Sequence, residues 1–579
     1  MIKIENLSFS FPQKDLYNNI SFTLEEGQHC AFIGTSGSGK STLIDLLMDP
    51  ERYLYDGKLE LSPNCRIGYV SQFSQLDKTK EITVYDYIGE TFIQLQNEIT
   101  SICTEMETSS DIDSLLEQYQ QALDAFDSIG GDDFESNLNK QLTLAGLSKH
   151  EDLPVSKLSG GEFKLVQVIK EMLTSPDLII MDEPDVFLDF DNLNSLKNLI
   201  NTHKGSLLVV THNRYLLNHC FNKIIHLENK LLQEFDGRYI DYNFSLLQSK
   251  IELQELSVAD TEEIKRNEII IKNLRANATA HTEASRGKSL KARVKIQERL
   301  EARRIKAPFV EIKQPKINFN IDNELADTTV LNVTDYCVSF DEILFEHVNF
   351  ELKSTDKVAL IGSNGSGKTT LLRSIFKNNH PAIEINENVK TAFLSQLQGE
   401  MQNESDTIMD AFFQVGFQTY DEVISYAANY GFDESVLHQK VSALSGGEKN
   451  ILQLAQISAG NANLLLLDEP TSHLDTYSQI ALEKAIETYK GAILMISHDF
   501  YSIVNCMDYI LIIEDKTIRK VSMRKFRKMI YAKHFGKDYL EIEQKKKAIE
   551  TKIELALKET DFELAKDLSE ELEELIKLL

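Results

Sequence analysis

The sequence lacks three features that would each indicate a particular class of protein. Its six cysteines are scattered with no CxxC pair, so neither a disulfide framework nor a zinc cluster is indicated. Its longest apolar runs, such as Leu464–Leu467 and Tyr509–Ile513, are far shorter than the ~18 residues that span a bilayer. It also lacks a basic excess, because 61 Lys and Arg stand against 90 Asp and Glu, and a net charge of −29 excludes a globally basic nucleic-acid coat protein.

The remaining composition is that of a soluble globular protein, with 42% hydrophobic and 26% charged residues. At about 150 residues per domain, a chain of 579 residues suggests roughly four units. Met1 opens into IKIENLSF, which has no basic segment leading into an apolar one. We therefore expect a cytoplasmic protein without membrane segments.

Five motifs occur twice in the chain, which indicates an internal repeat. The segment Gly34–Thr42 (GTSGSGKST) recurs as Gly362–Thr370 (GSNGSGKTT), 328 positions later, and Gln72 recurs as Gln396, 324 positions later. The other three pairs are all 286 positions apart: LSGGE at Leu158–Glu162 and Leu444–Glu448, DEP beginning at Asp182 and Asp468, and the histidines His212 and His498. The register thus changes once, by 38 residues, so the first copy carries an insertion that the second lacks.

These motif offsets divide the chain into two α/β nucleotide-binding units, about residues 1–248 and 325–519. The insertion, about residues 83–131, has helical apolar periodicity and predicts a helical arm. A charged stretch, residues 249–315, predicts a helical-hairpin linker that ends at Pro308 and Pro315. The last segment, 520–579, has heptad-like apolar residues with a break near Glu559–Asp561 and predicts a C-terminal helical hairpin.

Each copy of GxxxxGK[ST] follows an apolar run and precedes a segment of helical periodicity, which is the context of a phosphate-binding loop. Backbone N–H groups and a helix N-terminus would surround the phosphates there. A glycine-rich turn with a chance lysine is the alternative, and two copies in context argue against it. We predict ATP binding by the two phosphate loops, with Mg²⁺ ligated by Ser41 and Thr369. Their candidate residues are Gly34, Thr35, Ser36, Gly37, Ser38, Gly39, Lys40, Ser41, Thr42, Gly362, Ser363, Asn364, Gly365, Ser366, Gly367, Lys368, Thr369 and Thr370.

Acidic pairs follow the buried apolar runs at 178–181 and 464–467, where ligands of open α/β sheets bind. Asp182 and Asp468 suit Mg²⁺, directly or through water. The adjoining Glu183 and Glu469 are placed to orient or deprotonate the attacking water. A second buried strand in each copy leads to His212 and His498. A lone histidine is more often structural, but its repetition after a strand favours a contact with the γ-phosphate.

Together these motifs resemble the ATP-binding cassette superfamily, and tandem cassettes with a charged helical linker and no membrane segment resemble its ABC-F subfamily. The resemblance implies two cassettes that close head to tail on two ATP molecules. It implies that Gln72 and Gln396 join the Mg²⁺ sites, that Phe11 and Phe340 stack on adenine, and that each signature loop faces the opposite phosphate loop. Ser159, Gly160 and Gly161 would then face the nucleotide at Lys368, and Ser445, Gly446 and Gly447 the one at Lys40.

One departure from the family pattern separates the two copies. The second D-loop reads EPTSHLD (Glu469–Asp475), close to the usual form, whereas the first reads EPDVFLD (Glu183–Asp189). The catalytic glutamate and histidine occur in both copies. We therefore expect two hydrolysing sites with unequal rates.

The linker carries a local excess of positive charge, which the rest of the chain lacks. From Asp260 to Lys306 there are 13 Lys and Arg against 7 acids, and from Arg286 onward 9 against 2. A solvated helical spacer is the plain alternative. In ABC-F proteins this hairpin enters the ribosomal exit site, touches the acceptor end of the P-site tRNA and approaches the peptidyl-transferase centre. The resemblance and the local charge make these residues candidate RNA contacts: Arg275, His281, Arg286, Lys288 and Lys291.

The sequence therefore predicts a monomeric ABC-F ATPase with ATP and Mg²⁺ as cofactors and the ribosome (large-subunit rRNA and P-site tRNA) as partner. It would bind in the ATP-bound closed state and leave after hydrolysis. Stall relief and antibiotic target protection both fit. An ATPase subunit of an ABC transporter is the main rival, although we expect no stable membrane partner. A DNA-repair ATPase is weaker, because it would have a far longer coiled coil or zinc modules.

Overall fold

The computed structural model describes residues 2–11, 14–63, 65–72, 81–108, 112–186, 188–256, 295, 314–321, 328–340, 343–395, 405–534 and 539–579. It divides into two compact units. The first combines Met1–Asp236 with Lys313–Ile530 and holds both nucleotide-binding repeats. The second combines Gly237–Ile312 with Tyr531–Leu579.

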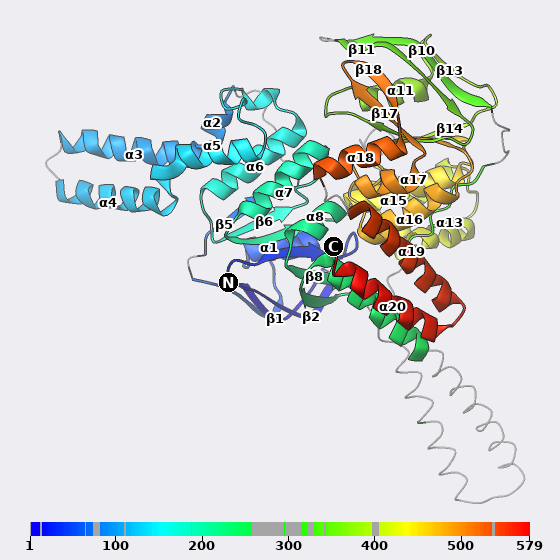
Figure 1. The fold of residues 1–579 in the computed structure, drawn as a ribbon. Coiled ribbons are helices and arrows are strands. Elements are labelled where there is room, and N and C mark those ends of the chain that lie inside the picture. The colour runs from blue at the N-terminus through cyan, green and yellow to red at the C-terminus, as the bar shows by residue number, and fades with distance from the viewer. Residues whose placement is uncertain are drawn as a thin grey trace, which may run out of the picture. The chain divides into compact units, whose positions relative to one another are not determined.

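The first repeat is built on a six-stranded sheet, visible in Figure 1 among the blue and green elements. The strands are parallel except the last, which runs antiparallel to its neighbour. The two strands after the LSGGE motif are buried along their whole length, as their unbroken apolar sequences predict. In spatial order the strands are β5 (Ile67–Val70), β6 (Leu178–Asp182), β7 (Ser206–Val210), β3 (His29–Ile33), β8 (Lys223–Glu228) and β9 (Leu231–Asp236).

A second, antiparallel sheet completes the first repeat, with strand order β2 (Lys14–Leu24), β1 (Ile2–Phe11) and β4 (Asp56–Leu61). Its strands alternate buried and exposed residues, so one face packs on the core that it shares with the parallel sheet. The helices that position the site are α1 (Lys40–Met48), α6 (Gly160–Leu173), α7 (Phe190–Thr202) and α8 (Arg214–Cys220). Shorter elements complete the repeat: α2 (Val84–Ile88), η1 (Gly131–Asp133), α5 (Phe134–Leu144) and η2 (Val155–Lys157).

The second repeat copies this topology. Its six-stranded sheet has the order β14 (Thr391–Leu394), β15 (Leu464–Asp468), β16 (Ala492–Ile496), β12 (Lys357–Ile361), β17 (Tyr509–Glu514) and β18 (Thr517–Ser522). Its antiparallel sheet is β11 (Ile343–Lys353), β10 (Thr329–Ser339) and β13 (Ile383–Ile385). The helices and turns are α11 (Lys368–Lys377), α12 (Ile408–Gln414), α13 (Tyr420–Ala427), η3 (Ala428–Tyr430), α14 (Glu434–Leu437), η4 (Val441–Ala443), α15 (Gly446–Ala459), α16 (Thr476–Thr488), α17 (Phe500–Cys506) and α18 (Met523–His534).

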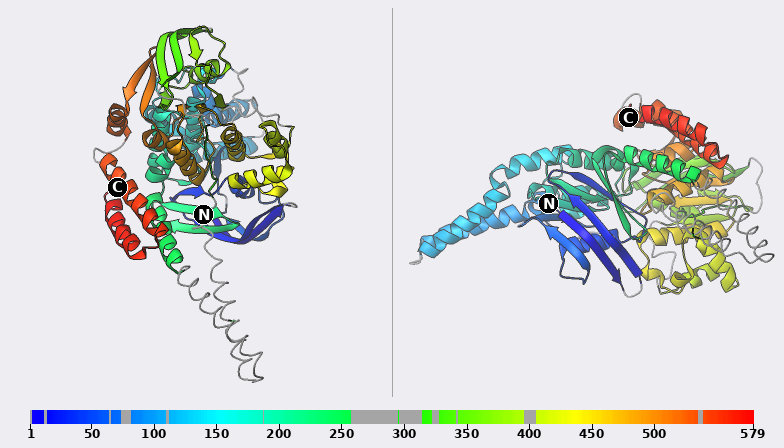
Figure 2. Two further views of the ribbon diagram at one scale, coloured as in Figure 1. Left: turned by 90° about the vertical axis from the view of Figure 1, so that its right-hand side faces the viewer. Right: turned by 90° about the horizontal axis from the view of Figure 1, so that it is seen from below.

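The insertion in the first repeat forms two packed helices, α3 (Glu90–Met106) and α4 (Ile112–Ser128). Figures 1 and 2 show this pair extending away from the sheets of the first repeat. A small apolar cluster of its own holds the pair together, with Ile102, Leu115 and Ala122 buried. The helices occupy most of the range in which the sequence predicts a helical arm.

The second unit has its own core. Residues 239–256 are helical, and α19 (Tyr539–Lys558) and α20 (Phe562–Ile576) pack on each other after a break at residues 559–561. Apolar side chains of all three helices form one cluster, in which Ile251, Ile553 and Leu572 are buried. Within the described residues, no helix combines the length and the apolar character that crossing a lipid bilayer requires.

Two of the boundaries drawn from sequence differ from those in the structure. The edge placed between residues 248 and 249 falls inside the continuous helix 239–256, and the compact first unit already ends at Asp236. The edge at 519/520 falls inside β18, and the second unit resumes only at Tyr531. Motif offsets locate the motifs but not the ends of the flanking strands and helices, so the first edge lies beyond the end of the compact unit and the second lies before it. The greater part of the linker hairpin predicted at 249–315 lies outside the described residues.

Candidate functional site

Both phosphate loops lie between a buried strand and a helix, β3 before α1 and β12 before α11. The lysine side chains are buried and fold back over the loops. The Lys40 Nζ donates to the carbonyl oxygens of Gly34 and Thr35, each at 2.9 Å. The Lys368 Nζ donates to those of Gly362 (2.8 Å) and Ser363 (3.0 Å). Burial lowers the pKa of both amines, while nearby carboxylates oppose that shift.

The strand-end aspartates lie beside the phosphate-loop hydroxyls. Ser41 Oγ donates to Asp182 Oδ2 at 3.2 Å, and burial raises the pKa of Asp182 to about 6. Burial also raises the pKa of Asp468, while a side-chain hydrogen bond with Thr369 opposes the shift. Carboxylate and hydroxyl oxygens that lie together in this way are ligands that a hard divalent cation prefers. The oxygen ligands at both strand ends therefore fit Mg²⁺.

The next residue in each repeat has a strained backbone. Glu183 has φ 46° and Glu469 has φ 50°, in the left-handed region that side chains rarely adopt. Their backbone N–H groups are held by the neighbouring strand, with Glu183 donating to Val210 O at 2.9 Å and Glu469 to Ile496 O at 3.0 Å. Such strain persists where the surroundings enforce it, and it concentrates at functional positions.

The two repeats contact each other through these loops. The Ser36 backbone N–H in the first phosphate loop donates to Asp475 Oδ2 in the second D-loop at 3.3 Å. In the mirrored contact, Asn364 N–H donates to Asp189 Oδ2 at 3.4 Å. The second signature loop lies against the first phosphate loop so closely that a Cβ at Gly447 would be 2.1 Å from Ser36 Oγ. Only glycine fits that position.

A cavity of about 550 Å³ occupies the other composite site, within the range of about 300–1,000 Å³ typical of ligand pockets. One wall is the second phosphate loop with Lys368 and Thr369, followed by Asp468, Glu469 and His498. The opposite wall is the first signature loop, with Ser159, Gly160 and Gly161. The structure therefore brings together the second phosphate loop, the strand-end residues and the first signature loop, which the resemblance assigns to one nucleotide site.

The two glutamates have different partners. The Glu183 Oε2 accepts from Gln72 Nε2 at 2.6 Å and lies 3.0 Å from the Nδ1 of His473, which comes from the second D-loop. Burial acts to raise its pKa, but the His473 contact and nearby positive charges outweigh it, so the pKa of Glu183 falls to about 2. Glu469 lies 3.5 Å from His498 Nε2, and burial raises its pKa to about 7.

An ion cluster next to the sites also joins the repeats. Arg214, the first residue of α8, donates to Glu483 on α16 and, at 2.7 Å, to Asp499 at the start of α17. The guanidinium also lies 4.8 Å from the ring centroid of Tyr501. All three charged side chains are largely buried, and the pKa of Arg214 is raised because the attraction of both carboxylates outweighs the effect of burial.

The remaining candidate residues are two histidines, two phenylalanines and a group that lies outside the described residues. Burial lowers the pKa of His212 to about 4 and that of His498 to about 3. Phe11 is 40% exposed and contacts Phe9 edge to face, whereas Phe340 is 71% exposed and is absent from the described lining of the cavity. These candidates lie outside the described residues: Gln396, Arg275, His281, Arg286, Lys288 and Lys291.

Sequence reasoning missed the residues that act between the repeats. His473 and the aspartates Asp189 and Asp475 belong to this group, as does Arg214. The repeated Leu-Asp pair at the end of each D-loop, 286 positions apart, was a signal for the aspartates. Arg214 carries no such signal, because the equivalent position of the second repeat is Phe500.

Two phosphate loops, each facing the signature loop of the other repeat, form the arrangement of paired ATP-binding cassettes. A family model described as "ABC transporter" matches residues 17–186 and 345–472, and the chain belongs to this family. The comparisons with known proteins further identify it as an ABC-F type ATPase, an ATP hydrolase, and so confirm the family resemblance and the tandem-cassette fold.

Relatives cover most of the chain. The "Uncharacterized ABC transporter ATP-binding protein YfmM" of Bacillus subtilis is 29% identical over 524 residues, 86% of this chain and 96% of that protein. "ABC transporter F family member 2" of Arabidopsis thaliana is 28% identical over 535 residues, 89% of this chain and 76% of that protein. Among solved structures, an archaeal ribosome recycling factor, aABCE1, in complex with the stalk protein aP1 has a TM-score of 0.52 and 15% identity, covering 91% of this chain and 92% of that one. At that identity the likeness shows the fold alone.

Proposed function

We propose that this ATPase binds the ribosome in its ATP-bound, closed state and is released after hydrolysis. The observation that carries the proposal is the pairing of both cassettes within one chain. Asp475 contacts the first phosphate loop and Asp189 the second, so one chain supplies both halves of both sites. A chain that closes on itself needs no second ATPase subunit, and its closure can reposition whatever joins the cassettes.

The two sites would use equivalent groups in the same roles. The phosphate-loop amides and Lys40 or Lys368 would hold the phosphates, and the opposite signature loop would close over them. Mg²⁺, which would neutralise phosphate charge, would be held by Ser41, Asp182 and Gln72 in one site and by Thr369, Asp468 and Gln396 in the other. Glu183 and Glu469 would orient the attacking water, with His212 and His498 near the γ-phosphate.

Two observations support the ribosome as the partner, namely the local charge of the linker and the similarity to known proteins. Residues 286–306 carry 9 basic against 2 acidic side chains in a chain of net charge −29, so RNA would be attracted to this segment and repelled elsewhere. A solved structure of similar fold is titled a model of ribosome-bound archaeal Pelota and ABCE1. We infer that the linker segment 249–315 reaches toward the P-site tRNA and the peptidyl-transferase centre, and that the outcome is stall relief or protection of the ribosome from antibiotics.

The test is cosedimentation of the Glu183→Gln/Glu469→Gln chain with 70S ribosomes and ATP. We expect the hydrolysis-deficient chain to accumulate on ribosomes, because release needs hydrolysis. A matched Lys40→Ala/Lys368→Ala chain, which would not hold the phosphates, should remain in the supernatant. Reversing the charges of Arg286, Lys288 and Lys291 should weaken the association in a salt-dependent way, most strongly at low salt, because fewer phosphate contacts remain. A glutamate variant that stays free of ribosomes with abundant ATP would disprove the proposal.

The main alternative, an ATPase subunit of a transporter, is favoured by the family description alone. Copurification of the chain with membranes would support it. Drug susceptibility measured with and without expression of the chain distinguishes antibiotic protection from stall relief.

A further inference from the structure

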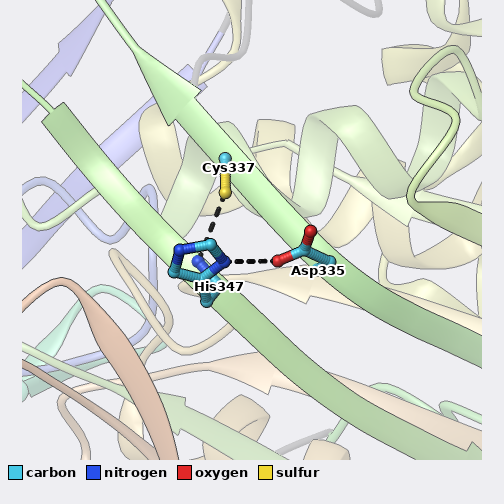
Figure 3. A group of neighbouring side chains, drawn as sticks. All are labelled: Asp335, Cys337 and His347. Carbon is cyan, nitrogen blue, oxygen red and sulfur yellow. Dashed lines mark hydrogen bonds and ion pairs between the residues drawn. The ribbon is translucent and has the colours of Figure 1, made fainter.

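Three side chains with metal-binding atoms meet on the antiparallel sheet of the second cassette, and none of them belongs to the described lining of the cavity. Asp335 and Cys337 lie two residues apart on β10, and His347 faces them from β11 (Figure 3). The His347 Nδ1 lies 2.5 Å from Asp335 Oδ1, and one donor atom from each of the three residues lies within 4.8 Å of the others. All three residues are exposed, so an ion could reach them from solvent.

The backbone fixes this arrangement. Asp335 has φ 56° and His347 has φ 50°, and the pairing of β10 with β11 shifts register between Val333 and Tyr336. Such a bulge bends a strand and aims its side chains out of the regular alternation. The His347 backbone N–H also donates to Cys337 Sγ at 3.3 Å, so the sulfur is held against the strand that carries the imidazole.

The first cassette has the same bulge with different side chains, and so provides an internal comparison. Asn6 and Asn19, each with φ 52°, occupy the places of Asp335 and His347, and Ser8 that of Cys337. The Asn19 backbone N–H donates to Ser8 Oγ at 2.9 Å, as His347 does to the sulfur. The backbone therefore needs only Asn, Ser and Asn at these places. The second cassette has instead a carboxylate, a thiol and an imidazole.

We propose that Asp335, Cys337 and His347 form a site for a zinc-like transition-metal ion. Thiolate and imidazole ligands select such ions, whereas Mg²⁺ and Ca²⁺ prefer oxygen ligands alone. Zinc–ligand distances of about 2.0–2.3 Å keep tetrahedral ligand atoms about 3.3–3.8 Å apart. Small rotations of these exposed side chains, about 2.5–4.8 Å apart here, reach that spacing. Three protein ligands leave the fourth position to water or another small ligand.

The experiment is a Co²⁺ titration of the reduced, metal-free full-length chain, followed by competition with Zn²⁺. We expect one equivalent to give a thiolate-to-cobalt charge-transfer band, which oxygen ligands at the nucleotide sites cannot produce. The Asp335→Asn/Cys337→Ser/His347→Asn chain carries the side chains of the first cassette, so its backbone should be retained and the band lost. A Cys103→Ser chain, altered at another exposed cysteine, should keep the band.

Single substitution of His347→Asn provides a second measure, because asparagine already takes the left-handed conformation at Asn19. We expect it to weaken Zn²⁺ affinity by more than about 100-fold, since loss of a ligand costs more than loss of an outer-shell contact. Absence of the thiolate band from the unaltered chain would overturn the proposal. So would a band or a Zn²⁺ affinity that the triple substitution leaves unchanged.

Discussion

Loss of the Arg214 guanidinium should weaken the pairing of the two cassettes more than loss of an exposed cation. Arg214 belongs to the first cassette, and its two carboxylate partners, Glu483 and Asp499, belong to the second. Their side chains are 12%, 9% and 16% exposed, respectively. In an Arg214→Ala chain, two largely buried carboxylates would remain with no cation between them.

The size of the expected loss in cassette pairing follows from the burial of the two carboxylates. Removing one partner of a buried ion pair costs about 3–5 kcal/mol, because the other charge is left uncompensated. At about 1.4 kcal/mol for each factor of ten, the pairing equilibrium would weaken roughly 140- to 4,000-fold. The added loss of the contact between Arg214 and Tyr501 acts in the same direction.

Hydrogen exchange and steady-state ATPase rate together measure this effect. We expect faster amide exchange in α8, α16 and α17 and a lower ATPase rate, because each site needs groups from both cassettes. Arg519→Ala is the matched control, since Arg519 and its partner Glu514 are each about half exposed and such pairs contribute at most about 1 kcal/mol. Equal behaviour of the Arg214→Ala and Arg519→Ala chains would refute the reasoning.

Two further predictions concern histidines. His473→Phe, which copies Phe187 of the first D-loop, should slow hydrolysis about 10- to 100-fold at the Glu183 site, the cost of a hydrogen bond to a charged group. The rate is measured in a Glu469→Gln background, and an equal loss in a Glu183→Gln background would contradict the assignment. Burial lowers the pKa of His203 from 6.5 to about 4, so the unfolded chain binds the proton more readily and stability falls as pH drops through that range. Between pH 7 and 5 we expect the loss of stability in urea unfolding to be smaller by about 1–2 kcal/mol in His203→Tyr, which copies Tyr489, than in the unaltered chain; an equal loss in both chains would assign the effect elsewhere.

The cassette fold could be predicted from the sequence because its signals are local. Unbroken apolar runs such as Leu178–Met181 and Leu464–Leu467 become strands buried along their whole length. The phosphate loops fix where a helix follows a strand, and the offset between copies fixes where the insertion lies. The break at residues 559–561, read from the heptad pattern, separates α19 from α20.

The contacts between cassettes could not be predicted in the same way. The partners of Arg214 are 269 and 285 positions away, and no spacing rule connects them. The same holds for His473 and Glu183, which are 290 positions apart. The cysteine spacing likewise excluded paired CxxC zinc clusters but could not reveal that a strand bulge brings Cys337 to His347. Only the folded chain supplies these neighbours.

Duplication explains why unlike sites can exist on like backbones. Glu183 and Glu469 share a strained conformation, with φ 46° and 50°, and both are held by the adjacent strand. The strain is therefore a property of the fold, whereas the partner of each carboxylate depends on the D-loop of the other cassette. The second D-loop supplies His473 to the Glu183 site, whereas the divergent first D-loop faces the Glu469 site. Substitutions in one cassette therefore change the chemistry of the other cassette. Unequal hydrolysis would then follow from D-loop divergence while both phosphate loops remain intact.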